Sequence, residues 1–247
     1  MTAISSSENE TRDTILDGSI TVVQPRHGYR FSVEAILLGR FARANAHERV
    51  LELGAGCGVV SIMIAALNRP REVVAIELQP SLAEMIARNA AINGLKFVYS
   101  ICADLRQKKV AGLEPASFDL VVANPPYRAS AAGRENPDRG RRLARGETAA
   151  ALEDFVATAR RYARVGARVA FVFTARRSAE LISAMRAEKL EPKRIRFVHP
   201  RIGMPASVIL LEARVGGGIE VAIEPPLILY DRPGIYTSEA RAILSSS

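Results

Sequence analysis

The sequence predicts a doubly wound α/β fold, in which a mostly parallel β-sheet carries helices on both faces. Two observations lead to this prediction. From about residue 49, short β-branched runs alternate with stretches of helical periodicity, which is the pattern of parallel strands joined by crossover helices. The chain also has 247 residues, 48% of them hydrophobic, and no internal repeat or low-complexity linker, so it can bury one sizeable core.

Turn and helix signals define the predicted elements. Arg49–Leu53 predicts a buried strand, and the glycines of residues 54–58 predict a tight loop before a helix over 59–67. Pro80 and Asn93-Gly94 mark the start and the end of a helix over 81–92. The remaining predicted strands are Glu72–Glu77, 97–102, Phe118–Ala123, 168–173, 193–199 and 207–214, and the remaining helices are 149–165 and 175–190.

The organisation along the chain is that of one domain with extensions. Residues 1–14 are polar and acidic and predict a flexible tail. Residues 15–247 are expected to form a single domain, with a lead-in over 15–48, a core over 49–215 and a C-terminal extension over 216–247.

Composition favours a cytoplasmic protein without a metal or a membrane span. The longest apolar run, residues 59–67, is half of the roughly 18 residues that a membrane helix needs. Cys57 and Cys102 lack the spacing of a metal or redox motif, and the three histidines are scattered. The formal net charge of +8 favours a polyanionic partner such as nucleic acid.

Small and acidic residues follow the first three predicted strands. Gly54, Gly56 and Gly58 allow a close backbone approach to a ligand, but Val59 stands where the dinucleotide fingerprint needs glycine. Glu77 can accept from both ribose hydroxyls, and Asp104 can accept from an adenine amino group. Glu52 can accept from an ammonium group or fix the loop. This order predicts an adenosine-containing ligand without a pyrophosphate, which S-adenosylmethionine fits.

Asn124-Pro125-Pro126-Tyr127 directly follows the strand Phe118–Ala123. Prolines lack amide donors and hold the backbone extended, so their carbonyls are free to point outward. The Asn124 amide oxygen beside such a carbonyl forms a pair of acceptors for a planar NH2 group. The Tyr127 ring offers a face on which a base can stack. The stretch is therefore suited to a reaction on an exocyclic amine or an amide.

Together these residues resemble the class I S-adenosylmethionine-dependent methyltransferases that methylate amino groups. Within that group the chain resembles the bacterial tRNA1(Val) adenine-37 N6-methyltransferase family, with further similarity over residues 24–32, 226–230 and 236–239. The resemblance implies a doubly wound, seven-stranded Rossmann-like sheet and S-adenosyl-L-methionine as cofactor.

The resemblance also implies a role for individual residues. Asn124 and the Pro125 carbonyl would hold the target amine, with Pro126 beside them, and Tyr127 would stack on the base. Arg30 and Phe31 would help to close the cofactor pocket or would anchor the start of a helix. The implied cofactor-binding residues are Arg30, Phe31, Glu52, Gly54, Gly56, Gly58, Glu77, Leu78, Ala103, Asp104, Leu105 and Asn124.

Arginines are concentrated after the proline motif, in a long stretch punctuated by Gly and Pro. We expect this stretch to grip RNA, with tRNA as the expected partner, and Lys193, Arg194, Arg196 and Arg201 to extend the basic surface. The arginines expected to bind nucleic acid are Arg128, Arg134, Arg139, Arg141, Arg142 and Arg145.

Other acceptors remain open at the level of sequence. A protein glutamine amide presents the same planar NH2 group, and guanine N2 of ribosomal RNA and adenine of DNA are further candidates. A module that binds cofactor and RNA without catalysis is a non-enzymatic alternative. The RNA, the modified nucleotide and the oligomeric state are not specified by the sequence.

Overall fold

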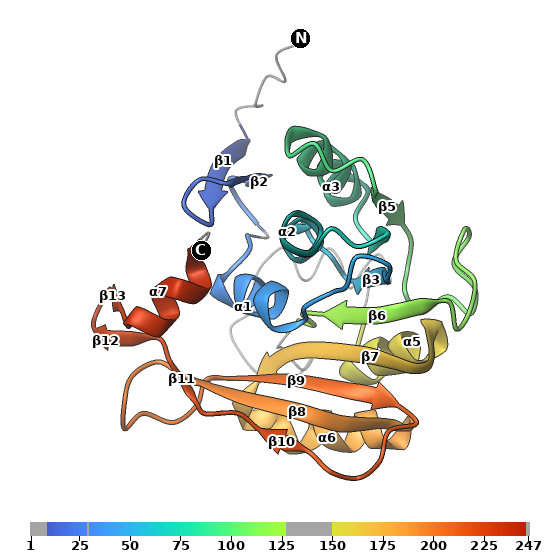
Figure 1. Cartoon of the computed structure of the whole chain (residues 1–247). Helices are drawn as coiled ribbons and strands as arrows, with labels where there is room; N and C mark the ends of the chain where they lie inside the picture. Colours follow the sequence, from blue (N-terminus) through green and yellow to red (C-terminus); the bar gives the residue numbers. More distant parts are fainter. Residues whose placement is uncertain (1–8, 29, 127–149, 246–247) are drawn as a thin grey trace, which may run out of the picture.

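The computed structural model describes residues 9–28, 30–126 and 150–245. Its main sheet has nine strands in the order β10-β8-β9-β7-β6-β3-β4-β5, with β11 also paired to β8 (Figure 1). These strands are β3 (Arg49–Leu53), β4 (Glu72–Glu77), β5 (Val98–Cys102), β6 (Phe118–Ala123), β7 (Ala163–Thr174), β8 (Leu190–His199), β9 (Val208–Val215), β10 (Ala222–Ile223) and β11 (Leu227–Ile228).

The predicted doubly wound fold is confirmed. Strands β5, β4, β3, β6 and β7 are parallel neighbours, and β9 is antiparallel to both β7 and β8. The seven predicted strands are all present, and the short strands β10 and β11 bring the sheet to nine. Because β3 has β4 on one side and β6 on the other, the strand order reverses between β3 and β6. Ligands of doubly wound sheets bind at the carboxyl ends of strands beside such a reversal.

Helices cover both faces because the strands are apolar on both. One core cluster joins α1 (Val33–Phe41), α2 (Val59–Asn68) and α3 (Pro80–Ile92) to strand residues such as Val50 and Leu120. A second cluster joins α5 (Leu152–Tyr162) and α6 (Ser178–Ala187) to the alternate strand residues, such as Leu51 and Val121. Successive strand side chains point to opposite faces, so each strand contributes to both cores.

Two predicted helices differ from the structure at their ends. The helix predicted over 149–165 is described from Leu152 and ends at Tyr162, because Ala163 already pairs with Phe118 as the first residue of β7. The helix predicted over 175–190 is a 3-10 turn followed by α6, and it ends at Ala187. Leu190 belongs to β8, where it pairs with Val215. In both cases strand pairing overrides the helical preference of the alanine-rich sequence.

Part of the expected flexible tail forms a β-strand. Within the expected flexible tail, residues 10–14 lie in β1 (Glu10–Ile15), which pairs antiparallel with β2 (Ile20–Pro25). Ion pairing of Arg88 on α3 with Glu10 supports this hairpin. The polar residues of β1 can form a strand because backbone pairing with β2 and this ion pair stabilise it in place of hydrophobic burial.

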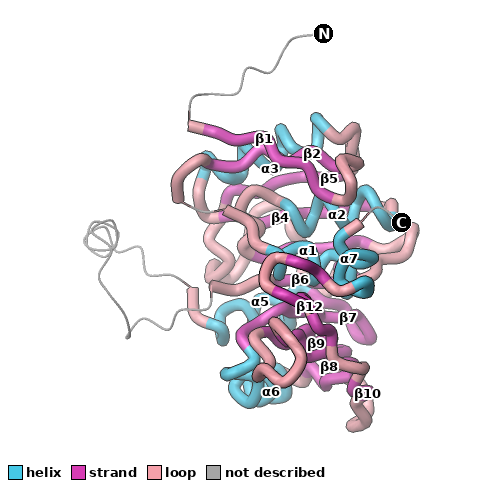
Figure 2. Tube along the Cα trace, turned by 90° about the vertical axis from the view of Figure 1, so that its left-hand side faces the viewer, coloured by secondary structure: helices cyan, strands magenta, loops and turns pink. Residues whose placement is uncertain are grey.

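The C-terminal extension packs back onto α1 (Figures 1 and 2). It contains β12 (Tyr230–Arg232), β13 (Ile235–Tyr236) and α7 (Ser238–Leu244). Arg40 of α1 donates hydrogen bonds to the carbonyls of Ile243, at 2.9 Å, and of Ser245. Within the described residues, no helix is both long and apolar enough to cross a membrane.

Candidate active site

The strand register brings the predicted site residues to one edge of the sheet. Leu53, the last residue of β3, pairs with Ile76 on β4 and with Ala123 on β6. Glu77, the last residue of β4, pairs with Cys102 at the end of β5. The glycine turn, Glu77, residues 103–105 and Asn124 therefore follow four neighbouring parallel strands at their carboxyl ends.

The turn after β3 requires glycine for steric reasons. Gly54, Gly56 and Gly58 have φ angles of +65°, +58° and +85°. A Cβ atom on Gly54 would lie 3.0 Å from the Phe155 ring, and one on Gly58 would lie 3.0 Å from Ile86. Left-handed backbone and close approach both exclude larger residues here. The chain consequently turns sharply and begins α2 at Val59.

Glu77 holds this turn from the next strand. Its carboxylate accepts hydrogen bonds from the backbone N–H groups of Gly56, at 2.8 Å, and of Gln79, at 2.9 Å. The residue is 6% exposed. An ionised carboxylate offers about four acceptor positions, so Glu77 retains capacity for ligand hydroxyls beyond the two backbone donors.

Glu52 is buried one residue before the end of β3. Its carboxylate accepts from the backbone N–H of Ser61, at 2.8 Å, and from the Ser61 hydroxyl. Burial raises the pKa of Glu52 to about 8, against the two hydrogen bonds from Ser61, and the charge of Glu77 adds to the rise. These contacts tie β3 to the first turn of α2, as the loop-fixing alternative expects.

Asp104 follows β5 and is paired with a neighbouring arginine. The Arg106 side chain donates to both oxygens of the Asp104 carboxylate, and these hydrogen bonds lower the pKa of Asp104. The backbone N–H of Ala103 donates to the Glu77 carbonyl at 3.0 Å. Leu105 is buried, whereas Leu78 is 48% exposed and leaves an apolar surface at the same edge.

Asn124 and Pro125 lie directly beside the glycine turn, because Leu53 and Ala123 are register partners. Pro125 is buried, Asn124 is half-buried and Pro126 is exposed. The Asn124 amide makes no hydrogen bond with the other residues that the structure describes. Tyr127 lies outside the described residues, as do Arg128, Arg134, Arg139, Arg141, Arg142 and Arg145.

The lead-in residues Arg30 and Phe31 are tied to the hairpin. Arg30 donates to the Thr11 hydroxyl at 2.8 Å and to the Pro25 carbonyl at 3.1 Å. The backbone N–H of Phe31 donates to the buried side chain of Gln24 at 3.0 Å. These contacts favour the anchoring role for both residues at the start of α1.

Three of the four residues expected to extend the basic surface make contacts within the protein. Arg194 pairs with Glu212 and Glu224 and stacks on the Phe41 ring at 3.9 Å. Arg196 pairs with Glu239 of α7, and Lys193 donates to backbone carbonyls of the C-terminal extension. These cations fasten the extension to β8, because each lies opposite one of its carboxylates or carbonyls.

Asn89 is a structural link to the site that sequence reasoning missed. It is fully buried on α3 and accepts from the backbone N–H of Val23 at 2.7 Å. Its amide also donates to the carbonyls of Val23 and Cys57, each at 2.9 Å. Asn89 thereby joins the hairpin to the glycine turn. The available signal was an asparagine on the apolar side of a helix, where its low helix propensity calls for a tertiary partner.

The residues at this edge of the sheet fit an adenosine cofactor without phosphates. Gly54, Gly56 and Gly58 carry no side chains, so a ligand can approach the backbone of the turn closely. Glu77 and Asp104 offer acceptors at the ends of adjacent strands, and the exposed Leu78 offers an apolar surface for a ring. Among the described residues, no group of three His, Cys, Asp or Glu side chains could hold a metal ion.

Comparisons with known proteins agree with one another on the protein family. Residues 33–185 match the family model for the methyltransferase small domain. A protein from Aeromonas hydrophila named tRNA1(Val) (adenine(37)-N6)-methyltransferase is 26% identical over 214 residues, covering 86% of this chain and 87% of that protein. A protein of the same name from Flavobacteriaceae bacterium strain 3519-10 is 33% identical over 107 residues, covering 43% of this chain and 45% of that protein.

Solved structures show the same fold. A structure described as a predicted O-methyltransferase from Agrobacterium tumefaciens has a TM-score of 0.68 at 23% identity and covers 85% of this chain and 94% of that one. M. jannaschii TYW2 in complex with AdoMet has a TM-score of 0.57 at 17% identity and covers 85% of this chain and 88% of that one.

Proposed function

Because the chain belongs to the methyltransferase small domain family, we propose that this S-adenosylmethionine-dependent methyltransferase modifies the exocyclic amine of adenine in RNA, with tRNA as the substrate. Residues 15–247 act as one methyltransferase domain in this proposal. The observation that carries it is the position of Asn124 and Pro125 beside the glycine turn, set by the pairing of Leu53 with Ala123. An amine held by Asn124 then lies next to the cofactor's methyl group.

The proposed chemistry depends mainly on position. The adenine amine is a poor nucleophile, because its lone pair is delocalised into the ring. S-adenosylmethionine, when bound, supplies a methyl group already activated on a sulfonium. The Asn124 amide oxygen and the Pro125 carbonyl would accept hydrogen bonds from the two N–H groups of the amine, which would direct the nitrogen lone pair toward the methyl group. The methylated nitrogen would then release its excess proton to water. No strong general base is required, and the rate gain comes from alignment and fixed dipoles.

The cofactor residues have distinct roles in this proposal. Gly54, Gly56 and Gly58 lie against the methionine part, Glu77 accepts from the ribose hydroxyls, and Asp104 with its neighbours faces the adenine. Glu52 acts through Ser61 by holding the turn in place. The hairpin contacts of Arg30 and Phe31 fix the start of α1 beside the cofactor.

RNA is favoured as the acceptor by charge and by the relatives. The net charge of +8 suits a polyanion, and the six arginines at positions 128–145 directly follow the catalytic motif. Relatives that align over most of the chain carry the name of a tRNA adenine-N6 methyltransferase. A base within a helix or a stacked loop cannot reach such a site, so the target nucleotide turns out and stacks on Tyr127.

The test is transfer of labelled methyl from S-adenosylmethionine to unmodified total tRNA, with unmodified ribosomal RNA and a release factor offered alongside as alternative acceptors. We expect label in one tRNA fraction, recovered as N6-methyladenosine after digestion to nucleosides. Label only in the protein would assign the activity to glutamine, and label only in ribosomal RNA recovered as N2-methylguanosine would move the target to guanine. Each of these results would contradict the proposal.

A further inference from the structure

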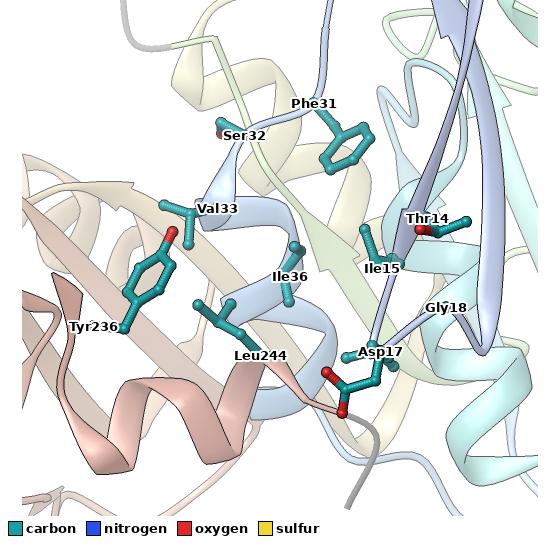
Figure 3. Close-up of a pocket in the computed structure, with 11 residues that line it drawn as sticks. Thr14, Ile15, Asp17, Gly18, Phe31, Ser32, Val33, Ile36, Tyr236 and Leu244 are labelled. Atoms are coloured by element: carbon teal, nitrogen blue, oxygen red, sulfur yellow. The ribbon is translucent and has the colours of Figure 1, made fainter. Parts of the chain in front are cut away.

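An open cavity of about 670 Å³ lies between the two segments that flank the family core. Its walls come from the β1–β2 turn, the start of α1 and the C-terminal extension. Figure 3 shows the side chains of α1 between those of the hairpin and those of the extension. Only two of its lining residues, Val33 and Ile36, fall within the matched residues 33–185.

The cavity begins at the edge of the sheet that carries Asn124. Arg168 shares a register row with Leu120 near the amino ends of the strands, and it donates to the carbonyls of Ala42 and Arg43, just after α1. The end of α1 therefore lies at the amino edge. Nine helical residues rise by about 13 Å, roughly the length of four strand residues. The start of α1, with Phe31 and Ser32, accordingly lies toward the carboxyl edge.

The lining suits a flat ring with a polar rim. Phe31 and Tyr236 supply aromatic surfaces, and Ile36 is among the aliphatic ones. Thr14, Asp17 and Ser32 supply oxygens, and the Ser32 hydroxyl is not used to cap α1. Among the described lining residues there is no Lys or Arg. A phosphate has no cation to pair with here, whereas a nucleobase finds stacking surfaces and acceptors for its amino group.

The walls are held in position before any ligand binds. Leu16, Asp17 and Gly18 at the hairpin turn all have positive φ angles, of +50°, +52° and +85°. Tyr236 stacks on Tyr230 with the ring centroids 4.8 Å apart. Asn89 ties the hairpin to the glycine turn, so the cavity wall and the cofactor edge form one connected structure.

We propose that this cavity is a second nucleotide site, which binds an unpaired base of the RNA near the methylated one. The inference rests on the proposed function, because it requires an RNA substrate. Binding of a second base outside the catalytic motif would help to select a loop in which two nucleotides are unstacked. The two segments flanking the family core would then contribute to substrate choice.

The experiment compares Tyr236→Leu with wild type in steady-state methyl transfer to total unmodified tRNA. Leucine keeps apolar volume but removes the stacking ring. We expect the KM for tRNA to rise about tenfold, with the Kd for S-adenosylmethionine within twofold of wild type. Asp17→Asn, which tolerates a positive φ angle, should raise the KM for tRNA about threefold because an NH2 donor replaces one of the two acceptor oxygens and the negative charge is lost.

Tyr99 provides a matched control. Tyr99→Leu removes an exposed aromatic ring from β5, outside the cavity lining. It should leave the KM for tRNA within twofold of wild type. If the wild type methylates tRNA but Tyr236→Leu and Asp17→Asn leave the KM for tRNA unchanged, the inference is overturned while the proposed function stands. Failure of the wild type to methylate any RNA would overturn the proposed function and the inference with it.

Discussion

Glu52 is the residue whose ionisation the fold opposes most clearly. Burial raises the pKa of Glu52 to about 8, from an ordinary value of 4.5. Between these two pH values the unfolded chain has released this proton while the folded chain retains it. The contribution of Glu52 to stability is therefore fully present below pH 4.5 and is lost as pH rises through about 8.

Glu52→Gln should remove this pH dependence, because the amide keeps an acceptor for Ser61 and cannot ionise. In cofactor-free protein we expect the free energy of unfolding of the wild type to fall by roughly 2–4 kcal/mol between pH 5.5 and 8.5, at about 1.4 kcal/mol per pKa unit. Urea unfolding of both proteins at these pH values measures the difference. Parallel pH profiles would show that Glu52 is ionised in the folded state throughout.

A substitution at Gly58 tests whether the turn after β3 requires glycine for steric reasons. Gly58→Ala places a Cβ atom 3.0 Å from Ile86 in left-handed backbone. Strain and overpacking together should cost about 2–5 kcal/mol in the free energy of unfolding and weaken cofactor binding.

Gly94→Ala is the matched control for Gly58→Ala. Gly94 has a similarly positive φ angle of +68°, but no atom lies within 4 Å of its added Cβ. This variant should lose only about 1–2 kcal/mol and bind S-adenosylmethionine as the wild type does. Equal losses in the two variants, measured by urea unfolding and calorimetric titration, would remove the close contact with Ile86 from the explanation.

At the scale of elements, the hairpin and the glycine turn depend on one side chain. Asn89→Ala leaves the backbone groups of Val23 and the carbonyl of Cys57 without their buried partner. We expect a loss of roughly 2–4 kcal/mol in stability, since each unsatisfied buried group costs about 1–3 kcal/mol. Faster hydrogen exchange at the Val23 amide and at least tenfold weaker binding of S-adenosylmethionine should accompany it.

Asn93→Ala tests the attachment of the β1–β2 hairpin to α3 without removing a contact with the glycine turn. Asn93 bonds the backbone of Thr21 on the same hairpin but does not reach the glycine turn. Its loss should speed exchange in the hairpin while leaving the affinity for S-adenosylmethionine within twofold. If both variants weakened cofactor binding to the same degree, the link through Cys57 would not be the route by which the hairpin supports the site.

At the scale of the whole molecule, sequence patterns predict the features that are decided by residues close together in the chain. The seven strands follow from β-branched runs, and the edge that collects Gly54, Glu77, Asp104 and Asn124 follows from parallel pairing. The predicted helix ends at residues 165 and 190 are wrong, because pairing with strand partners far along the chain decides where these helices end.

Long-range polar contacts are the part that sequence could not supply. The pairing of Arg194 and Arg196 with carboxylates of β9 and the C-terminal extension depends on which strands become neighbours. The same is true of Asn89, whose partners lie 32 and 66 residues away. The roles assigned to the site residues accordingly remain predictions, and the site's position on the fold is what sequence alone could anticipate.

The most direct measurement is single-turnover methyl transfer to tRNA by wild type and Asn124→Ala, with the Kd for S-adenosylmethionine measured on both proteins. If Asn124 holds the target amine, turnover should fall by at least a hundredfold, which is about 2.7 kcal/mol of transition-state stabilisation, while the Kd changes by less than threefold. A comparable loss in cofactor affinity would make Asn124 a structural residue of the pocket and would contradict the account.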